Sequence, residues 1–311
     1  MSSRPAAPPP IGQLVDVGGY RLHLACQGEG SPTVVMEAAI GETGLLWSLV
    51  QPAVAQRSRG CVYDRAGLGW SDASPRPRTA AVMVEELHHL LARAEVPGPY
   101  VLVGHSLGGL LVRLYAARYP QEVAGLVLVD ATHEQQYVRA PTEIRELLPQ
   151  VEEQMGQQLE GLKALIASGS LDPAMLPVPP GLPEAAAETF RALVAASPNH
   201  VETFIAEQQA VGAIHAELAA ASTSLGDLPL VVLSHGQPMA MPGLAPEVNQ
   251  ANERLWQELQ AELAGLSSRG RLVVAQGSGH YIQLERPQLV IEAIAEVVAA
   301  ARTNQDHSRL G

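Results

Sequence analysis

The stretch that decides the fold is Gly104-His105-Ser106-Leu107-Gly108-Gly109, which directly follows the apolar run Tyr100–Val103. A G-x-S-x-G run between a buried strand and a helix is typical of a sharp turn that exposes a serine hydroxyl. Side chains at positions 104 and 108 would collide with the neighbouring strand and helix, so glycine is needed there. The N-terminus of the following helix offers N–H groups and positive dipole to an oxyanion. We therefore predict that Ser106 is a catalytic nucleophile; the alternative is an ordinary glycine-rich turn capped by serine.

A serine hydroxyl is a weak nucleophile unless a neighbouring base takes its proton. In folds with this turn the base follows the last strand, which the apolar run Leu272–Ala275 predicts here. The next residues are Gln276-Gly277-Ser278-Gly279-His280, and their two glycines make a loop that can bring an imidazole to the edge of the sheet. We predict that His280 is the general base, the alternative being a loop histidine without a role. The other histidines show no spacing typical of a zinc site, so we expect no metal.

The acid that orients this histidine has two candidate positions. The commonest layout places it after the strand Leu230–Leu233, but the residues that follow, 234–238, contain no carboxylate, and the next one is Glu247. One strand earlier, the run Leu126–Val129 leads directly into Asp130. A carboxylate there lies at the edge next to the nucleophile and can reach His280. We predict Asp130 as the acid, with Glu247, or no acid at all, as the alternative; Asp130 could also only cap a turn.

An oxyanion needs two N–H donors. The first is the N–H of Leu107, directly after the nucleophile. The second comes from the loop after the third strand, which reads Glu37-Ala38-Ala39-Ile40-Gly41. We predict Ala39 as this donor, with Ile40 as the alternative.

Strands and helices alternate along most of the chain, which predicts an α/β fold with a mainly parallel sheet covered by helices on both faces. The expected helices include Leu45 to Gln56, one capped by Thr79, Ser106 to Tyr119, one near Asn249 to Leu263, and one after Pro287. Residues 133–224 show no strand pattern, and we expect a helical lid there. Its apolar residues are predicted to form one stripe facing the pocket or core: Met155, Leu159, Leu162, Leu165 and Ile166. The core is then 11–132 and 225–302, between a disordered tail at 1–10 and a frayed tail at 303–311.

These motifs together resemble the α/β-hydrolase superfamily, in the branch of esterases, haloperoxidase-like and haloalkane-dehalogenase-like enzymes. The segments that carry the resemblance are Thr33–Gly41, Tyr63–Ser71, the turn at Ser106, Leu126–Asp130 and Gly277–His280. The resemblance implies a sheet of the eight-stranded type and a structural role for Asp64 and Arg65 in the Tyr63–Ser71 loop.

The sequence departs from this family in two places. Dehalogenase and epoxide-hydrolase members carry Asp where this chain has Ser106, which disfavours those reactions. The family's loop often reads His-Gly where this chain has Glu37-Ala38, so the geometry of the oxyanion site need not follow the family's.

Composition excludes several classes of partner. The formal net charge of −12 disfavours nucleic acid and anionic membrane surfaces. No apolar run reaches the roughly 18 residues of a membrane span, and Met1 to Pro10 lack the apolar core of a signal peptide. We interpret Cys26 and Cys61 as two small buried residues without a disulfide. A cytoplasmic protein is the expectation, and the sequence does not address its oligomeric state.

The pattern predicts a serine hydrolase that cleaves a small-molecule carboxylic ester without cofactor or metal. The same triad could serve a cofactor-free perhydrolase, an amidase or a carbon–carbon bond hydrolase, because these share the fold and the residues. A non-catalytic binding protein is a third possibility, against which the presence of both Ser106 and His280 argues.

Overall fold

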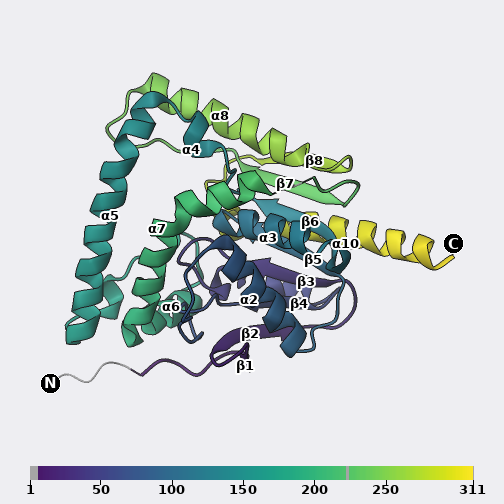
Figure 1. Cartoon of the computed structure of the whole chain (residues 1–311), viewed down its shortest axis with the longest axis horizontal. Coiled ribbons are helices and arrows are strands. Elements are labelled where there is room, and N and C mark those ends of the chain that lie inside the picture. Colours follow the sequence, from purple (N-terminus) through teal and green to yellow (C-terminus); the bar gives the residue numbers. More distant parts are fainter. Residues whose placement is uncertain (1–5, 222–223, 311) are drawn as a thin grey trace.

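The computed structural model describes residues 6–221 and 224–310. Within these residues eight strands form one sheet in the order β1-β2-β4-β3-β5-β6-β7-β8 (Figure 1). The strands are β1 Gln13–Asp16, β2 Arg21–Gln27, β3 Thr33–Glu37, β4 Gly60–Tyr63, β5 Tyr100–His105, β6 Val123–Val129, β7 Leu230–His235 and β8 Gly270–Ala275. The pairs β1–β2 and β2–β4 are antiparallel and the other pairs are parallel, which confirms the predicted mainly parallel α/β sheet.

Helices cover both faces of this sheet. One face packs against α2 (Ala80–Arg93), α3 (Leu107–Arg118) and α8 (Pro246–Ala264), and the other against α1 (Gln51–Val54), α9 (Ile282–Glu285) and α10 (Pro287–Leu310). Alternate residues of β5 divide between the two apolar clusters: Leu102 belongs to the first, and Val101 and Val103 to the second. Because both faces are buried, the central strands are continuous apolar runs rather than alternating ones.

Two local expectations have different outcomes. The Thr79 side chain caps α2 by accepting from the Val82 N–H at 3.2 Å, as predicted. The single helix expected over Leu45 to Gln56 is wrong: a 3-10 turn, η1 (Gly44–Trp47), is followed by the separate helix α1. Pro52, which has no N–H to continue a preceding helix, stands at the start of α1 instead.

The expected tails, 1–10 and 303–311, are described only in part. Helix α10 continues past residue 302 to Leu310, and no glycine or proline interrupts it after its first residue, Pro287. Of the N-terminal segment, residues 1–5 lie outside the described part, whereas the carbonyl of Pro8 accepts a hydrogen bond from Trp70 Nε1 at 2.8 Å.

Between β6 and β7 the described residues are helical. This insertion contains α4 Gln136–Arg139, α5 Thr142–Ser168, η3 Pro173–Met175, α6 Glu184–Ala196 and α7 Pro198–Ala220; another 3-10 turn, η2 Pro120–Glu122, precedes β6. In Figure 1, α5 stands at the edge of the molecule and α7 lies between it and the helices over the sheet. None of the described helices combines the length and the apolar character needed to cross a bilayer.

The predicted apolar stripe of the insertion is only partly present. Leu159 and Ile166 are buried in a third apolar cluster, and Leu162 packs against it, but Met155 and Leu165 are exposed. The stripe is therefore narrower than predicted: Met155 contacts Gln208 of α7 but stays exposed beside a cavity between α5 and α7.

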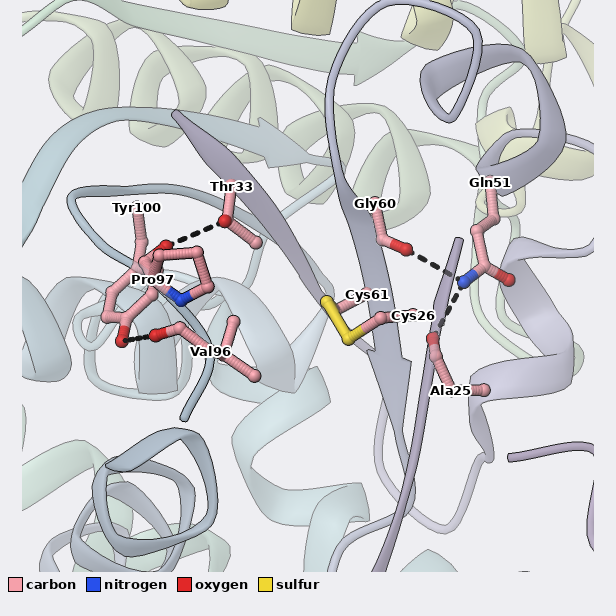
Figure 2. Close-up of a disulfide and its surroundings, with 9 residues drawn as sticks. All are labelled: Ala25, Cys26, Thr33, Gln51, Gly60, Cys61, Val96, Pro97 and Tyr100. Atoms are coloured by element: carbon pink, nitrogen blue, oxygen red, sulfur yellow. Dashed lines mark hydrogen bonds between the residues drawn. A yellow bond between two sulfur atoms is a disulfide. The ribbon is translucent and has the colours of Figure 1, made fainter. Parts of the chain in front are cut away.

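The structure contradicts the expectation for the two cysteines. Cys26 of β2 lies directly opposite Cys61 of β4 in the antiparallel pair, and the two form a disulfide (Figure 2). Cys61 is buried, but Cys26 is exposed. Beside the disulfide, Gln51 Nε2 donates to the carbonyls of Ala25 and Gly60, one on each strand.

Replacing both cysteines, Cys26→Ser with Cys61→Ser, should lower the free energy of unfolding by ~2–4 kcal/mol, because the bond closes a 35-residue separation in the unfolded chain. Urea unfolding followed by circular dichroism measures this loss. The parent should lose the same amount in dithiothreitol, and the double variant should not respond. Two titratable thiols in the denatured, unreduced parent would show that the disulfide does not form.

Candidate active site

The turn at Ser106 has the strained shape that the sequence predicts. Ser106 has φ +53°, in the left-handed region that L residues rarely adopt. A Cβ atom on Gly104 would lie 2.4 Å from the carbonyl oxygen of Gly108, and one on Gly108 would lie 2.7 Å from that of Glu37. A Cβ on Gly109 would lie 2.3 Å from the side chain of Ala131. The steric conflicts predicted at positions 104 and 108 are thus confirmed, and they bring β3, β5 and α3 together at the serine.

Asp130 and His280 form the contact that the sequence predicts. His280 Nδ1 lies 2.6 Å from Asp130 Oδ2, and because a carboxylate can only accept, this nitrogen carries the proton. The Asp130 side chain is fully buried, whereas 25% of the His280 side chain is exposed. Glu247, the alternative acid, is exposed in the first turn of α8.

Asp130 also lies next to the nucleophile in the sheet. The preceding residue, Val129, pairs with His105, and its carbonyl accepts from the Ser106 N–H at 3.2 Å. Asp130 itself has φ +42°. Two residues with left-handed backbone thus follow adjacent strand ends, an arrangement typical of functional sites, where such strain of ~1–3 kcal/mol is tolerated.

The surroundings of Asp130 include a second histidine that the sequence analysis did not assign to the site. His235, the last residue of β7, donates to Asp130 from its backbone N–H at 2.9 Å and from Nδ1 at 2.8 Å. Trp256 Nε1 of α8 donates to the same carboxylate at 3.2 Å. Burial alone would raise the pKa of Asp130, but the hydrogen bonds from His235 and His280 outweigh it and hold that pKa well below its ordinary value. Asp130 is therefore ionised.

His105, which directly precedes Ser106, holds the backbone of His280. Its Nε2 donates to the His280 carbonyl at 2.8 Å, and the two rings lie 4.6 Å apart. Burial lowers the pKa of His105 to about 3, so this histidine is neutral.

The loop that should supply the second oxyanion donor is fixed by a buried arginine. Arg65 donates to the carbonyls of Ala38 and Ala39, at 3.0 and 2.7 Å, so these two oxygens are occupied. The same guanidinium pairs with Glu37 at 2.7 Å and, in a bidentate contact, with Glu207 of α7. All three charged side chains are at most 2% exposed. The expected structural role of Arg65 therefore includes the shape of the loop that carries Ala39.

Helix α7 contacts this loop at a second point. The Gly41 N–H donates to Glu207 at 2.9 Å, and the Gly41 carbonyl accepts from His200 Nε2 at 3.0 Å. His200 Nδ1 in turn accepts from the Gly69 N–H at 3.2 Å. Burial lowers the pKa of His200 to about 4, which keeps the ring neutral. Sequence spacing gave no signal for these contacts, because Glu207 and His200 lie more than 150 residues beyond Gly41.

A mainly apolar cavity of about 280 Å³ borders this loop. Gly41, Glu42 and Tyr281 form one part of its wall, and Tyr281 directly follows His280. The insertion forms the rest, with Leu159, Leu162, Leu176, Val178, Phe190, Val194 and Phe204 among the lining residues. Burial raises the pKa of Glu42 to about 7, although the charge of Arg65 and a hydrogen bond with Tyr281 both lower it. The described residues contain no group of three His, Cys, Asp or Glu side chains that could hold a metal ion.

Comparison with known proteins agrees with this fold. Residues 32–172 match the family described as alpha/beta hydrolase fold. YqjL, an uncharacterized protein of Bacillus subtilis, is 26% identical over 282 residues, which cover 88% of this chain and 87% of YqjL. The probable transporter efuK of Hormonema carpetanum is 35% identical over 136 residues, but the chain spans only 20% of its length.

Solved structures show the same fold. An epoxide hydrolase, CorEH, superposes with a TM-score of 0.68 at 19% identity and covers 92% of this chain and 98% of its own. An esterase from Thermogutta terrifontis superposes with a TM-score of 0.59 at 21% identity and covers 91% of this chain and 94% of its own. The chain is an α/β-hydrolase-fold protein, and the family match supports its assignment to the α/β-hydrolase superfamily.

The buried ion pair between Arg65 and Glu207 leads to a stability prediction. Glu207→Gln should lower the free energy of unfolding by ~3–5 kcal/mol, because it removes the charge that faces a buried guanidinium. Chemical unfolding measures the difference. Glu85→Gln is the matched control: its partner Arg76 is 39% exposed, so we expect a loss of only ~0–1 kcal/mol. Equal losses in the two variants would contradict the importance of the buried pair.

Proposed function

We propose that this protein is a serine hydrolase that cleaves carboxylic esters through Ser106, His280 and Asp130. The observation that carries the proposal is the 2.6 Å hydrogen bond from His280 to a fully buried, ionised Asp130, which follows the strand next to that of Ser106. This is the arrangement of a base and its orienting acid in serine hydrolases. The left-handed turn at Ser106 supports it, because this turn exposes the hydroxyl at the start of a helix.

In the proposed reaction His280 Nε2 takes the proton of Ser106 Oγ as this oxygen attacks the ester carbonyl carbon. The N–H groups of Leu107 and Ala39 stabilise the oxyanion, and Arg65 keeps the loop of Ala39 in place by binding its carbonyl. His280 then protonates the departing alcohol. Water, deprotonated by His280, attacks the acyl-enzyme and releases the acid and Ser106. No metal or cofactor takes part in this sequence.

The cavity next to the site favours an uncharged, apolar substrate group. Its lining is mainly aliphatic and aromatic, and a volume of about 280 Å³ suits a group of moderate size. An anionic substrate group in this cavity would lie beside the Glu42 carboxyl. The Arg65 guanidinium would not compensate for this, because it is already paired with two carboxylates. We therefore propose neutral esters with a short to medium apolar acyl or alcohol group.

The insertion, residues 133–224, is proposed to be the lid of this site. Two features support this role: its side chains line most of the cavity, and α7 contacts the loop at Gly41. In this proposal the core consists of residues 11–132 and 225–302. The disulfide supports an oxidising compartment as the location.

Ser106→Ala should fold like the parent and lose ester hydrolysis by ~10³-fold or more, because the covalent route disappears. Hydrolysis of a chain-length series of p-nitrophenyl esters and labelling with a fluorophosphonate probe measure the effect. Ser168→Ala, at an exposed position of α5, is the control and should keep both activity and labelling. Labelling that survives in Ser106→Ala would place the nucleophile elsewhere, and a labelled but ester-inactive parent would favour the amidase, perhydrolase or carbon–carbon hydrolase alternatives.

Asp130→Asn should keep the fold but favour the wrong tautomer of His280, because an amide can donate to Nδ1 where the carboxylate only accepts. Turnover should fall by up to ~10⁴-fold. Glu247→Gln, which changes the exposed alternative acid, should be nearly as active as the parent. Steady-state kinetics of both variants decide between the two acids: an active Asp130→Asn with an inactive Glu247→Gln would overturn the proposed triad.

A further inference from the structure

The Asp130 carboxylate is shared between two histidines, His280 and His235. The second, His235, is fully buried, with a side chain exposed fraction of 0%. Its Nδ1 lies 2.8 Å from Asp130 Oδ2, and its Nε2 lies 3.2 Å from Glu253 Oε2 of α8. The imidazole of His235 thus lies between two carboxylates.

The protonation of His235 follows from these partners. A neutral imidazole has one donor and one acceptor nitrogen, whereas an ionised carboxylate only accepts. Both ring nitrogens of His235 face carboxylate oxygens, so both are satisfied only if both carry a proton. Trp256 stacks beside the ring with centroids 5.4 Å apart, within the range at which an aromatic face stabilises a cation.

The charged and titratable groups around His235 come from three elements. Asp130 follows β6, Glu253 belongs to α8, and His280, from the loop after β8, shares the Asp130 carboxylate. Gln257 adds a neutral contact: its Nε2 donates to the His235 carbonyl at 3.2 Å and to Glu253 at 2.9 Å. Burial alone would lower the pKa of His235. The hydrogen bonds and charges of Asp130 and Glu253 outweigh burial, so the pKa of His235 is raised above its ordinary value.

We propose that His235 is a positioning residue that acts as a permanent imidazolium: it orients the Asp130 carboxylate toward His280 and partly neutralises it. The inference rests on the proposed function, since it assigns to His235 an effect on the Ser106–His280–Asp130 triad. The positive charge of His235 would affect the proposed base, His280. His280 must be neutral to take the Ser106 proton, and a second cation on the same carboxylate disfavours the protonated, inactive form of His280. His235 therefore extends ester hydrolysis to lower pH.

The first experiment is the pH profile of kcat/KM for His235→Gln, measured with a neutral p-nitrophenyl ester. Glutamine keeps a donor toward Asp130 but removes the positive charge. The acid limb should then move to higher pH by about 1–3 units, the shift that a single nearby charge typically causes. A side chain that only fills space would lower kcat/KM equally at all pH values and leave the acid limb in place.

His215→Gln is the matched control. His215 is also buried, but it lies in α7, its pKa is lowered to about 4 mainly by burial, and it stacks on Tyr137 rather than on the triad. Its replacement should leave the acid limb unchanged. Circular dichroism and thermal unfolding of both variants establish that they fold before the profiles are compared.

The second experiment needs no ester substrate. Long-range ¹H–¹⁵N correlation spectra of the ¹⁵N-histidine-labelled parent report the protonation of each ring. The signal that is missing from folded His235→Gln or His235→Asn is the signal of His235. At pH about 7.5, one unit above the ordinary histidine value, His235 should show two protonated nitrogens while His215 shows one.

The outcomes separate this inference from the proposed function. A neutral His235 at that pH, or an unmoved acid limb in a folded His235→Gln, overturns the role of His235 and leaves the triad standing. A parent that cleaves no ester and is not labelled at Ser106 refutes the proposed function, and the spectra then decide alone whether His235 is the imidazolium that the geometry requires.

Discussion

The steric crowding at Ser106 is the constraint on which the rest of the site depends. The left-handed backbone at this residue is possible only because strand β5, strand β3 and helix α3 approach at backbone distance, through glycines at positions 104 and 108. A methyl group at Gly108 would have to displace the carbonyls of Glu37 and Ala38, which belong to the end of β3 and the loop that carries Ala39. The same contact that allows the strained turn therefore sets the spacing between Ser106 and the loop that carries Ala39.

The position of the acid follows from what each strand end supplies. A buried carboxylate is tolerated only when donors surround it. The end of β6 supplies Asp130, and the end of β7 supplies donors instead: the backbone N–H and the ring of His235. Helix α8 adds Trp256 on the same carboxylate. In the proposed triad the carboxylate stands after β6. His235 at the end of β7 can therefore be a cation that donates to it.

The sequence could predict those parts of the site whose residues are consecutive in the chain or directly follow a strand. The strand, glycines and helix around Ser106 are consecutive, and Asp130 and His280 each follow an apolar run directly, so their place at the edge of the sheet could be inferred. The disulfide could not, because Cys26 and Cys61 meet through the register of an antiparallel pair that no local pattern specifies. Residues 234–238 were considered only for a carboxylate, so His235 was given no role. Its contacts depend on Glu253, which reaches His235 only through the packing of α8.

The contacts of α7 limit how the insertion can move if it acts as a lid. Glu207 completes the buried pairing of Arg65 and binds the Gly41 N–H, so moving α7 away would leave a buried guanidinium with a single carboxylate and release the oxyanion loop. Breaking such a pair costs ~3–5 kcal/mol. Helix α5 has no comparable tie: it packs on α7 and leaves Met155 and Leu165 exposed. If residues 133–224 act as the proposed lid, we expect opening between α5 and α7 with α7 staying on the core, because the loop of Ala39 and Gly41 then keeps its contacts.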